Sequence, residues 1–192
     1  MKFTYKGGKN MNSRRTRKIV FSALMASLTA AATMVIHIPS AFGGYIHLGD
    51  GMVLLGGILL GPLAGAAAGG IGSMMADLLS GYAFYAPATF LIKALGAFSS
   101  GYLYRRLSPK GRERHFQILP FLAAGILCSA AVTGGYFIFE LAVYGRSAAL
   151  VNVPFNLVQN LFSLIVGGAL LPVLLRVHEI RDLNKKAVSG KI

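Results

Sequence analysis

Charged residues are scarce in this chain, and acidic residues are the scarcest. Of 192 residues 13% are charged, with 6 Asp and Glu against 19 Lys and Arg. An ordinary soluble domain carries about 25% charged residues, so this composition argues against one. The single cysteine, Cys128, excludes an internal disulfide, and its place in an apolar run predicts a small core residue.

Signatures of catalysis and nucleotide binding are also missing. The sequence contains no P-loop, nucleophile elbow, zinc-protease or intramembrane-protease pattern. We therefore expect no catalytic residue, no metal site and no cofactor bound by this chain. The alternation of apolar and polar residues that is typical of an outer-membrane barrel is absent too.

Long apolar runs are what the chain has in abundance. Hydrophobic residues make up 55% of it, and its mean hydropathy is +0.62. The runs lie at about 19–38, 52–80, 87–107, 116–143 and 148–175, and about 20 apolar residues cross a bilayer core. We predict an all-α integral membrane protein. The first run follows a basic stretch, but it is long for a signal peptide and is expected to be a retained helix.

The second run is too long for one crossing, because a helix of that length would measure about 45 Å. Gly61-Pro62 inside it is a turn signal. Of the 19 basic residues, 17 fall within 2–18, 105–114 and 176–191. Basic loops remain in the cytoplasm, and all three blocks share one side only if the chain turns at Gly61-Pro62. This predicts six transmembrane helices with both termini cytoplasmic.

The predicted organisation is therefore a basic tail at 1–18, a membrane domain at 19–176 and a basic tail at 177–192. Within the domain, four charged side chains lie toward the outer half: Asp50, Asp77, Lys93 and Glu140. A charge at the bilayer centre costs at least about 2.5–3.5 kcal/mol, so each needs a partner or a function. We expect Lys93 to pair with Asp77, because a short loop joins their helices. The alternative is that these groups contact a ligand.

Amides near the outer end of the last run favour a small-molecule site. Asn152, Asn156 and Asn160 recur every four residues with Gln159 beside them, so one helix face carries several amides. Such amides also join helices to one another. Together with Glu140 and the outer tyrosines, however, they fit a small-molecule pocket. We expect Asn156 and Gln159 to face Glu140 beneath the loop that carries Tyr45.

Aromatic side chains of the outer connections fit either an interfacial belt or a lid that stacks on a planar ligand. They are Tyr45, Tyr82, Phe84 and Tyr85. For His37 and His47 we expect loop structure or ligand hydrogen bonding rather than metal binding. The predicted substrate-binding residues are Tyr45, His47, Tyr85, Thr89, Lys93, Tyr136, Glu140, Asn156 and Gln159.

Small residues recur every fourth position in the first run. One row is Ser22, Ala26 and Ala30, and the neighbouring row is Ala23, Ser27 and Ala31. In a bilayer, such rows let another helix approach closely. From spacing alone, packing inside the bundle and docking of a partner helix remain about equally supported.

The blocks GPLAG, GSMMADLLSGY, IKALGAF and the later NVPFNLVQN resemble the S components of energy-coupling factor (ECF) vitamin transporters. The resemblance covers nearly the whole chain and is greatest for the branch with hydroxymethylpyrimidine, pyridoxine and some riboflavin-type members. It implies six helices and a vitamin site near the outer face, built from the first outer loop and helices 4 to 6.

The resemblance also implies partners: a transmembrane T component and two cytosolic ATPases, which use the ATP. It assigns docking on the T component to Ser22, Ala26 and Ala30. The expected function is capture of a planar heterocyclic vitamin at a bacterial cell membrane. The alternative is a proton-coupled carrier with Asp77, Lys93 or Glu140 as relay, which the lack of an inverted repeat disfavours. A membrane enzyme has no catalytic constellation to support it.

Overall fold

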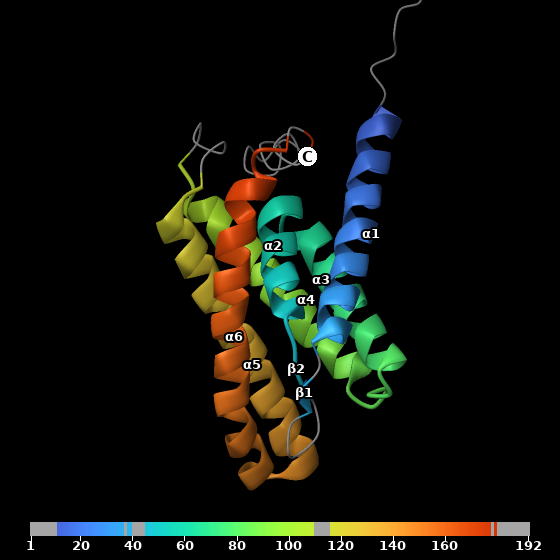
Figure 1. Ribbon diagram of the computed structural model, residues 1–192, viewed down its shortest axis with the longest axis vertical. Helices are drawn as coiled ribbons and strands as arrows, with labels where there is room; N and C mark the ends of the chain where they lie inside the picture. The colour runs from blue at the N-terminus through green and yellow to red at the C-terminus, as the bar shows by residue number, and fades with distance from the viewer. Residues whose placement is uncertain (1–10, 37, 40–44, 110–115, 178, 180–192) are drawn as a thin grey trace, which may run out of the picture.

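The computed structural model describes residues 11–36, 38–39, 45–109, 116–177 and 179 (Figure 1). The described part holds six helices and one pair of two-residue strands. The helices are α1 Met11–Val35, α2 Gly49–Leu60, α3 Pro62–Leu79, α4 Ala86–Leu107, α5 Ile118–Tyr144 and α6 Arg146–Leu174. The strands β1 Ile38–Pro39 and β2 Tyr45–Ile46 pair antiparallel between α1 and α2. The predicted all-α, six-helix membrane fold is confirmed.

The predicted break inside the second apolar run is also confirmed. α2 ends at Leu60, and Pro62 opens α3 as its first residue, where its missing N–H costs nothing. Between them, Gly61 has φ +90° and ψ 174°, a region that is essentially open only to glycine. The chain therefore reverses direction in a single residue.

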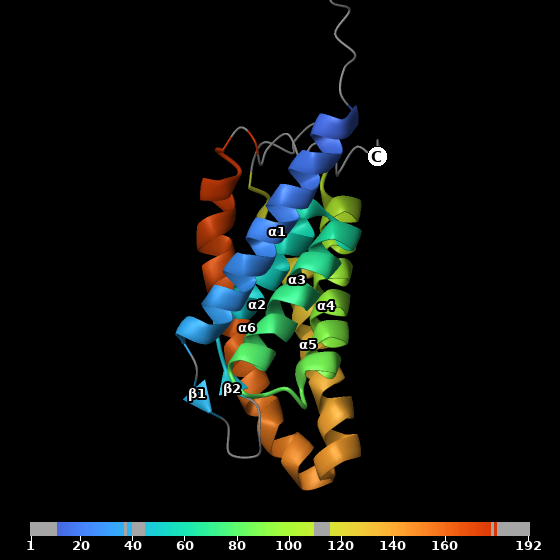
Figure 2. The ribbon, with the colours of Figure 1, turned by 90° about the vertical axis from the view of Figure 1, so that its right-hand side faces the viewer.

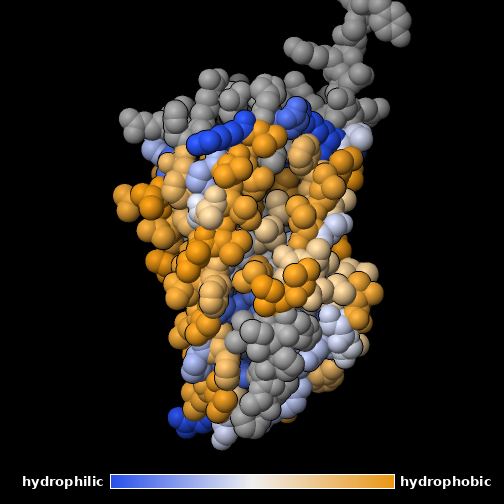
Figure 3. All heavy atoms as spheres, viewed as in Figure 1, coloured by the Kyte–Doolittle hydropathy of each residue, from blue (hydrophilic) through white to orange (hydrophobic). Residues whose placement is uncertain are grey.

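The helices run roughly along one axis (Figures 1 and 2). α1 begins and α6 ends at one end of the molecule, whereas β1, β2 and the α5–α6 turn lie at the other. Hydrophilic side chains gather at the first of these ends, above a broad apolar surface (Figure 3). The described parts of the three basic blocks thus share one end, as six crossings require. Which compartment that end faces remains a prediction.

By length and composition, α1 (from Arg15), α5 and α6 are suited to cross a membrane, and α2 is a shorter apolar helix. α2 has only 12 residues, yet every one except Met52 is buried. It contacts α1, α3, α4 and α6. Because protein surrounds it, α2 does not need the length of a helix that meets lipid on its own.

Three glycines allow α2, α3 and α4 to meet backbone to backbone. A Cβ on Gly57 would lie 2.2 Å from the Ala97 carbonyl oxygen, and one on Gly101 would lie 2.3 Å from the Gly57 carbonyl oxygen. A Cβ on Gly65 would lie 2.5 Å from the Gly57 Cα. Without a hydrophobic driving force between helices in lipid, such close packing is a main source of association.

We expect Gly57→Ala to destabilise the purified protein, since backbone atoms of α4 cannot move aside as a flexible side chain could. Overpacking costs about 1–3 kcal/mol, which lowers the melting temperature by about 2–12 °C in a chain of this size. The matched control is Gly134→Ala on α5, where a Cβ meets nothing within 4 Å. Equal melting temperatures for the two variants would contradict the close three-helix junction.

Candidate functional site

A buried ion pair lies at the centre of the polar residues. Lys93 on α4 is 0% exposed, and its Nζ pairs with Oδ1 of Asp50, which is 2% exposed in the first turn of α2. The predicted partner was Asp77, so that prediction is wrong. α2 packs against α4 over much of its length, which places its first turn beside Lys93 although Asp50 is more distant in sequence than Asp77.

Gln159 of α6 connects this ion pair to the segment before α2. Its Nε2 donates to Oδ2 of Asp50 at 2.7 Å, and its Oε1 accepts from the His47 backbone N–H at 3.0 Å. His47 Nδ1 in turn accepts from the Gly49 N–H at 3.1 Å. Both carboxylate oxygens of Asp50 are therefore occupied. Three predicted ligand contacts, His47, Lys93 and Gln159, are bonded into one closed network.

Tyr136 of α5 also contacts Lys93, through the face of its ring. The Lys93 Nζ sits 5.0 Å from the centre of the Tyr136 ring, a distance at which a cation is attracted to the ring face. The Tyr136 hydroxyl shares a hydrogen bond of 3.0 Å with Thr89 Oγ1 of α4. Thr89 and Tyr136, both predicted, thus meet between α4 and α5.

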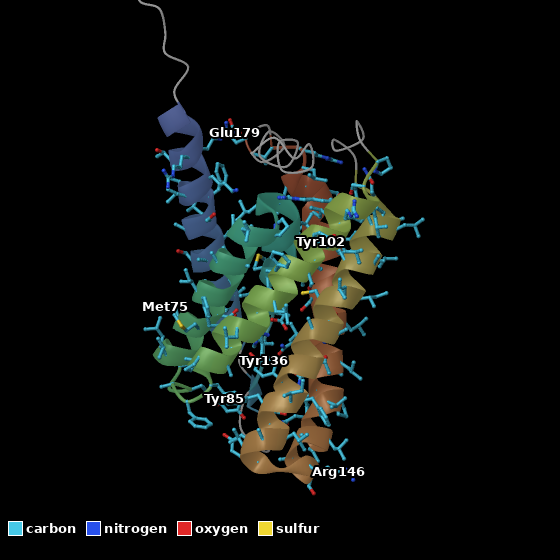
Figure 4. All side chains as sticks on the ribbon, turned by 180° about the vertical axis from the view of Figure 1, so that it is seen from behind. Met75, Tyr85, Tyr102, Tyr136, Arg146 and Glu179 are labelled. Atoms are coloured by element: carbon cyan, nitrogen blue, oxygen red, sulfur yellow. The ribbon has the colours of Figure 1, made fainter. Side chains whose placement is uncertain are left out.

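A second polar cluster lies closer to the α5–α6 turn. Glu140 of α5 is 4% exposed, and its Oε1 accepts from Asn152 Nδ2 of α6 at 3.0 Å. Aromatic rings pack on one another near Glu140 in the chain: Tyr85 lies 5.2 Å from Phe139, the residue before Glu140, and 6.2 Å from Tyr144, one helical turn after it, measured between ring centres. Tyr85 and Tyr136 occur on the same side of the bundle, with Tyr85 nearer the end that carries Arg146 (Figure 4).

The structure therefore brings most predicted site residues together, but in two clusters rather than one. Of the two amides expected to face Glu140, Gln159 bonds Asp50 instead, and the amide that bonds Glu140 is Asn152. For Asn156 the expectation stays a prediction. Asn156 is half-buried. Tyr45 lies in β2, but its side chain is not described. His37 lies outside the described residues.

Two residues of these clusters, Asp50 and Asn152, were not among the predicted contacts. Each carried a signal in the sequence. Asp50 is an acid next to an apolar run, and Asn152 begins the four-residue amide repeat. What the sequence could not supply was the lateral placement of α2 between α4 and α6.

On α1, the two rows of small residues face different surroundings. Ser22, Ala26 and Ala30 are half-buried, whereas Ala23, Ser27 and Ala31 are exposed. A Cβ on Gly72 of α3 would lie 2.3 Å from the Ala26 carbonyl oxygen. The first row therefore borders the packing of α1 on α3, and the second row faces away from the bundle.

We expect Lys93→Met to destabilise the protein by about 3–5 kcal/mol, because it leaves the buried Asp50 carboxylate without its cation. Adding Asp50→Asn to Lys93→Met should restore much of the lost stability, since no buried charge then remains unpaired. Thermal unfolding of the purified full chain measures both effects, with Arg106→Met at an exposed position as control. Additive losses in the double variant would contradict a coupled pair.

Comparisons with known proteins agree with this architecture. A family model described as "ECF-type riboflavin transporter, S component" matches residues 13–176. An uncharacterized protein of Pyrococcus woesei is 32% identical over 139 residues, which cover 72% of this chain and 88% of that protein. The thiamine precursor transporter HmpT of Lactococcus lactis subsp. cremoris is 25% identical over 179 residues, 92% of this chain and 99% of HmpT.

Two solved structures share the fold at 20% sequence identity. The S component of a bacterial ECF transporter gives a TM-score of 0.63, with 84% of this chain and 97% of that one covered. ThiT from Listeria monocytogenes gives 0.59, with 87% and 98% covered.

Proposed function

Because this chain belongs to the family of S components of ECF-type riboflavin transporters, we propose that it captures a vitamin or vitamin precursor at the outer face of the cell membrane for ATP-driven import. As a family member it is a multi-pass protein of the cell membrane and a transport subunit. The observation that carries the proposal is the convergence of buried polar groups from α4, α5, α6 and the segment before α2 at one end of an apolar bundle.

A planar heterocycle is the substrate class that fits this end of the molecule. Tyr85, Phe139 and Tyr144 offer ring faces, and Glu140 and Asn152 offer hydrogen-bonding groups beside them. Hydroxymethylpyrimidine, a B6 vitamer and riboflavin all combine a flat ring with polar substituents. A thiamine precursor transporter among the relatives supports the first of these.

The proposed orientation follows from charge. The helix ends that carry the described basic residues of the three blocks, the start of α1 and the ends of α4 and α6, lie opposite β1 and β2 (Figures 1 and 2), and basic segments remain in the cytoplasm. The polar clusters then lie in the outer half, where a substrate arriving from outside reaches them first.

The proposed partners are a transmembrane T component and two cytosolic ATPases, which membership of the ECF S-component family implies. The alternative, a self-sufficient proton-coupled carrier, needs a buried acid or base free to exchange protons. Of the three relay candidates, Asp77, Lys93 and Glu140, Lys93 is bonded to Asp50, which does not suit it to such a relay. The uptake experiment below decides for the other two.

The decisive test is uptake in cells that lack other routes for the substrate. The substrate is first identified by mass spectrometry of the small molecule that co-purifies with the full chain. We expect uptake only when a T component and both ATPases are coexpressed, and we expect a protonophore to have no direct effect in ATP-loaded vesicles. Uptake by this chain alone, driven by a proton gradient, would establish the carrier instead.

The resemblance assigns docking to the half-buried row of Ser22, Ala26 and Ala30, but the row that faces away from the bundle is Ala23, Ser27 and Ala31, and we propose docking through this exposed row. Ala31→Leu tests the proposal, because it adds bulk there without disturbing the bundle. We expect uptake to fall about tenfold or more, equivalent to about 1.4 kcal/mol lost from the docked state, with unchanged affinity of the isolated subunit. Ala130→Leu, exposed on α5, is the matched control. Loss of uptake in Ala30→Leu but not in Ala31→Leu would assign docking to the half-buried row of Ser22, Ala26 and Ala30.

A further inference from the structure

Glu140 has a hydrogen-bonding capacity that the described chain leaves unused. Its Oε1 accepts from Asn152, but its Oε2 is buried without a hydrogen-bonding partner anywhere in the described residues. Leaving a buried polar atom unsatisfied costs about 1–3 kcal/mol, and more when the group is charged. Such an atom in a folded protein calls for an explanation, and a missing ligand is one.

Asp50 supplies a comparison within the same bundle. It is equally buried, and its two oxygens are taken by Lys93 and Gln159. Both oxygens of Asp50 are thus satisfied by side chains of the bundle. Glu140 differs, because α6 offers it one amide and leaves the second oxygen open.

The surroundings of Glu140 favour a flat partner. The Tyr85 and Tyr144 rings lie at 26° to each other with centres 6.2 Å apart, and Phe139 packs on Tyr85 at 5.2 Å. Phe84 approaches Phe139 at 5.9 Å. Aromatic faces of this kind stack on planar rings.

The charges near the site disfavour an anionic partner. Three carboxyl groups of the described residues, those of Asp50, Asp77 and Glu140, are buried. Lys93 is the buried cation of this region, and it is bonded to Asp50. Arg146 lies at the same end of the molecule but is exposed. A phosphate ester, with a charge of about −1.5 to −2 at pH 7, would therefore enter a region where acids outnumber the buried cation.

We propose that Glu140 Oε2 accepts a hydrogen bond from an amino group or ring N–H of a flat, unphosphorylated heterocycle, and that the site rejects the phosphate ester of the same ring. This rests on the proposed function and narrows its substrate class. Within that class it favours an aminopyrimidine or an amine-bearing pyridine. Glu140 is then a ligand contact, and Asn152 positions it by holding Oε1.

The test measures binding to the full chain in lipid nanodiscs by calorimetry, with three matched pairs. They are 4-amino-5-hydroxymethyl-2-methylpyrimidine and its monophosphate, pyridoxamine and its 5′-phosphate, and riboflavin and its 5′-phosphate. We expect an amine-bearing ring to bind, and its phosphate to bind at least about 100-fold more weakly, since like charges brought together cost several kcal/mol. Equal affinity for ring and phosphate overturns the proposal.

Glu140→Gln then tests the contact itself. It keeps the size of the side chain but replaces the acceptor pair with an amide, so the amine-bearing ring should bind about 10- to 100-fold more weakly, as expected for loss of a charged hydrogen bond. A deaminated analogue of the same ring should bind the unmodified protein more weakly by a similar factor. This measurement tests the same hydrogen bond even if the Glu140→Gln variant fails to fold.

The outcomes separate this inference from the function on which it rests. Tight binding of a ring that neither Glu140→Gln nor deamination weakens overturns the role of Glu140 and leaves vitamin capture standing. Failure of every ring to bind the full chain, together with absence of uptake in the presence of the partners, overturns the proposed function as well.

Discussion

The buried pair of Lys93 and Asp50 is the interaction on which the polar interior depends. A lysine that is 0% exposed in an apolar bundle would cost at least about 2.5–3.5 kcal/mol in the bilayer centre without a partner. Asp50 pairs with that charge through one carboxylate oxygen, and Gln159 donates a hydrogen bond to the other oxygen. In this way Asp50, Lys93 and Gln159 join α2, α4 and α6. Gln159 also accepts from the backbone N–H of His47 and so holds that segment against α6.

This closed network explains why the second cluster can remain open. A carboxylate with an unused oxygen is tolerated only if the rest of the structure is stable enough to bear it. The glycine junction of Gly57, Gly65 and Gly101 packs α2, α3 and α4 at backbone distance, and the hydrogen bond from Gln159 to Asp50 ties α6 to the same unit. The closest packing lies around α2, and the proposed ligand contacts lie beyond it, toward the α5–α6 turn.

The sequence predicted the elements of this fold well, because each left a local signal. The turn at Gly61-Pro62, the helix count and the shared end of the basic blocks follow from a glycine, a proline and the placement of Lys and Arg. The partner of Lys93 could not be predicted in the same way. Asp77 is nearer in sequence, and only the insertion of α2 between α4 and α6 brings Asp50 closer in space. The same cause separated Gln159 from Glu140, since a helix face shared in sequence meets different neighbours along its length.

The dependence of α2 on its neighbours also has a consequence during synthesis of the chain. Asp50 finds Lys93 only 43 residues later in the chain and Gln159 only 109 residues later. Until α6 has emerged from the ribosome, the short α2 has no complete enclosure, and its carboxylate is only partly satisfied. A chain interrupted before α6 would therefore leave the Asp50 carboxylate without its second partner and α2 without one of the helices that enclose it.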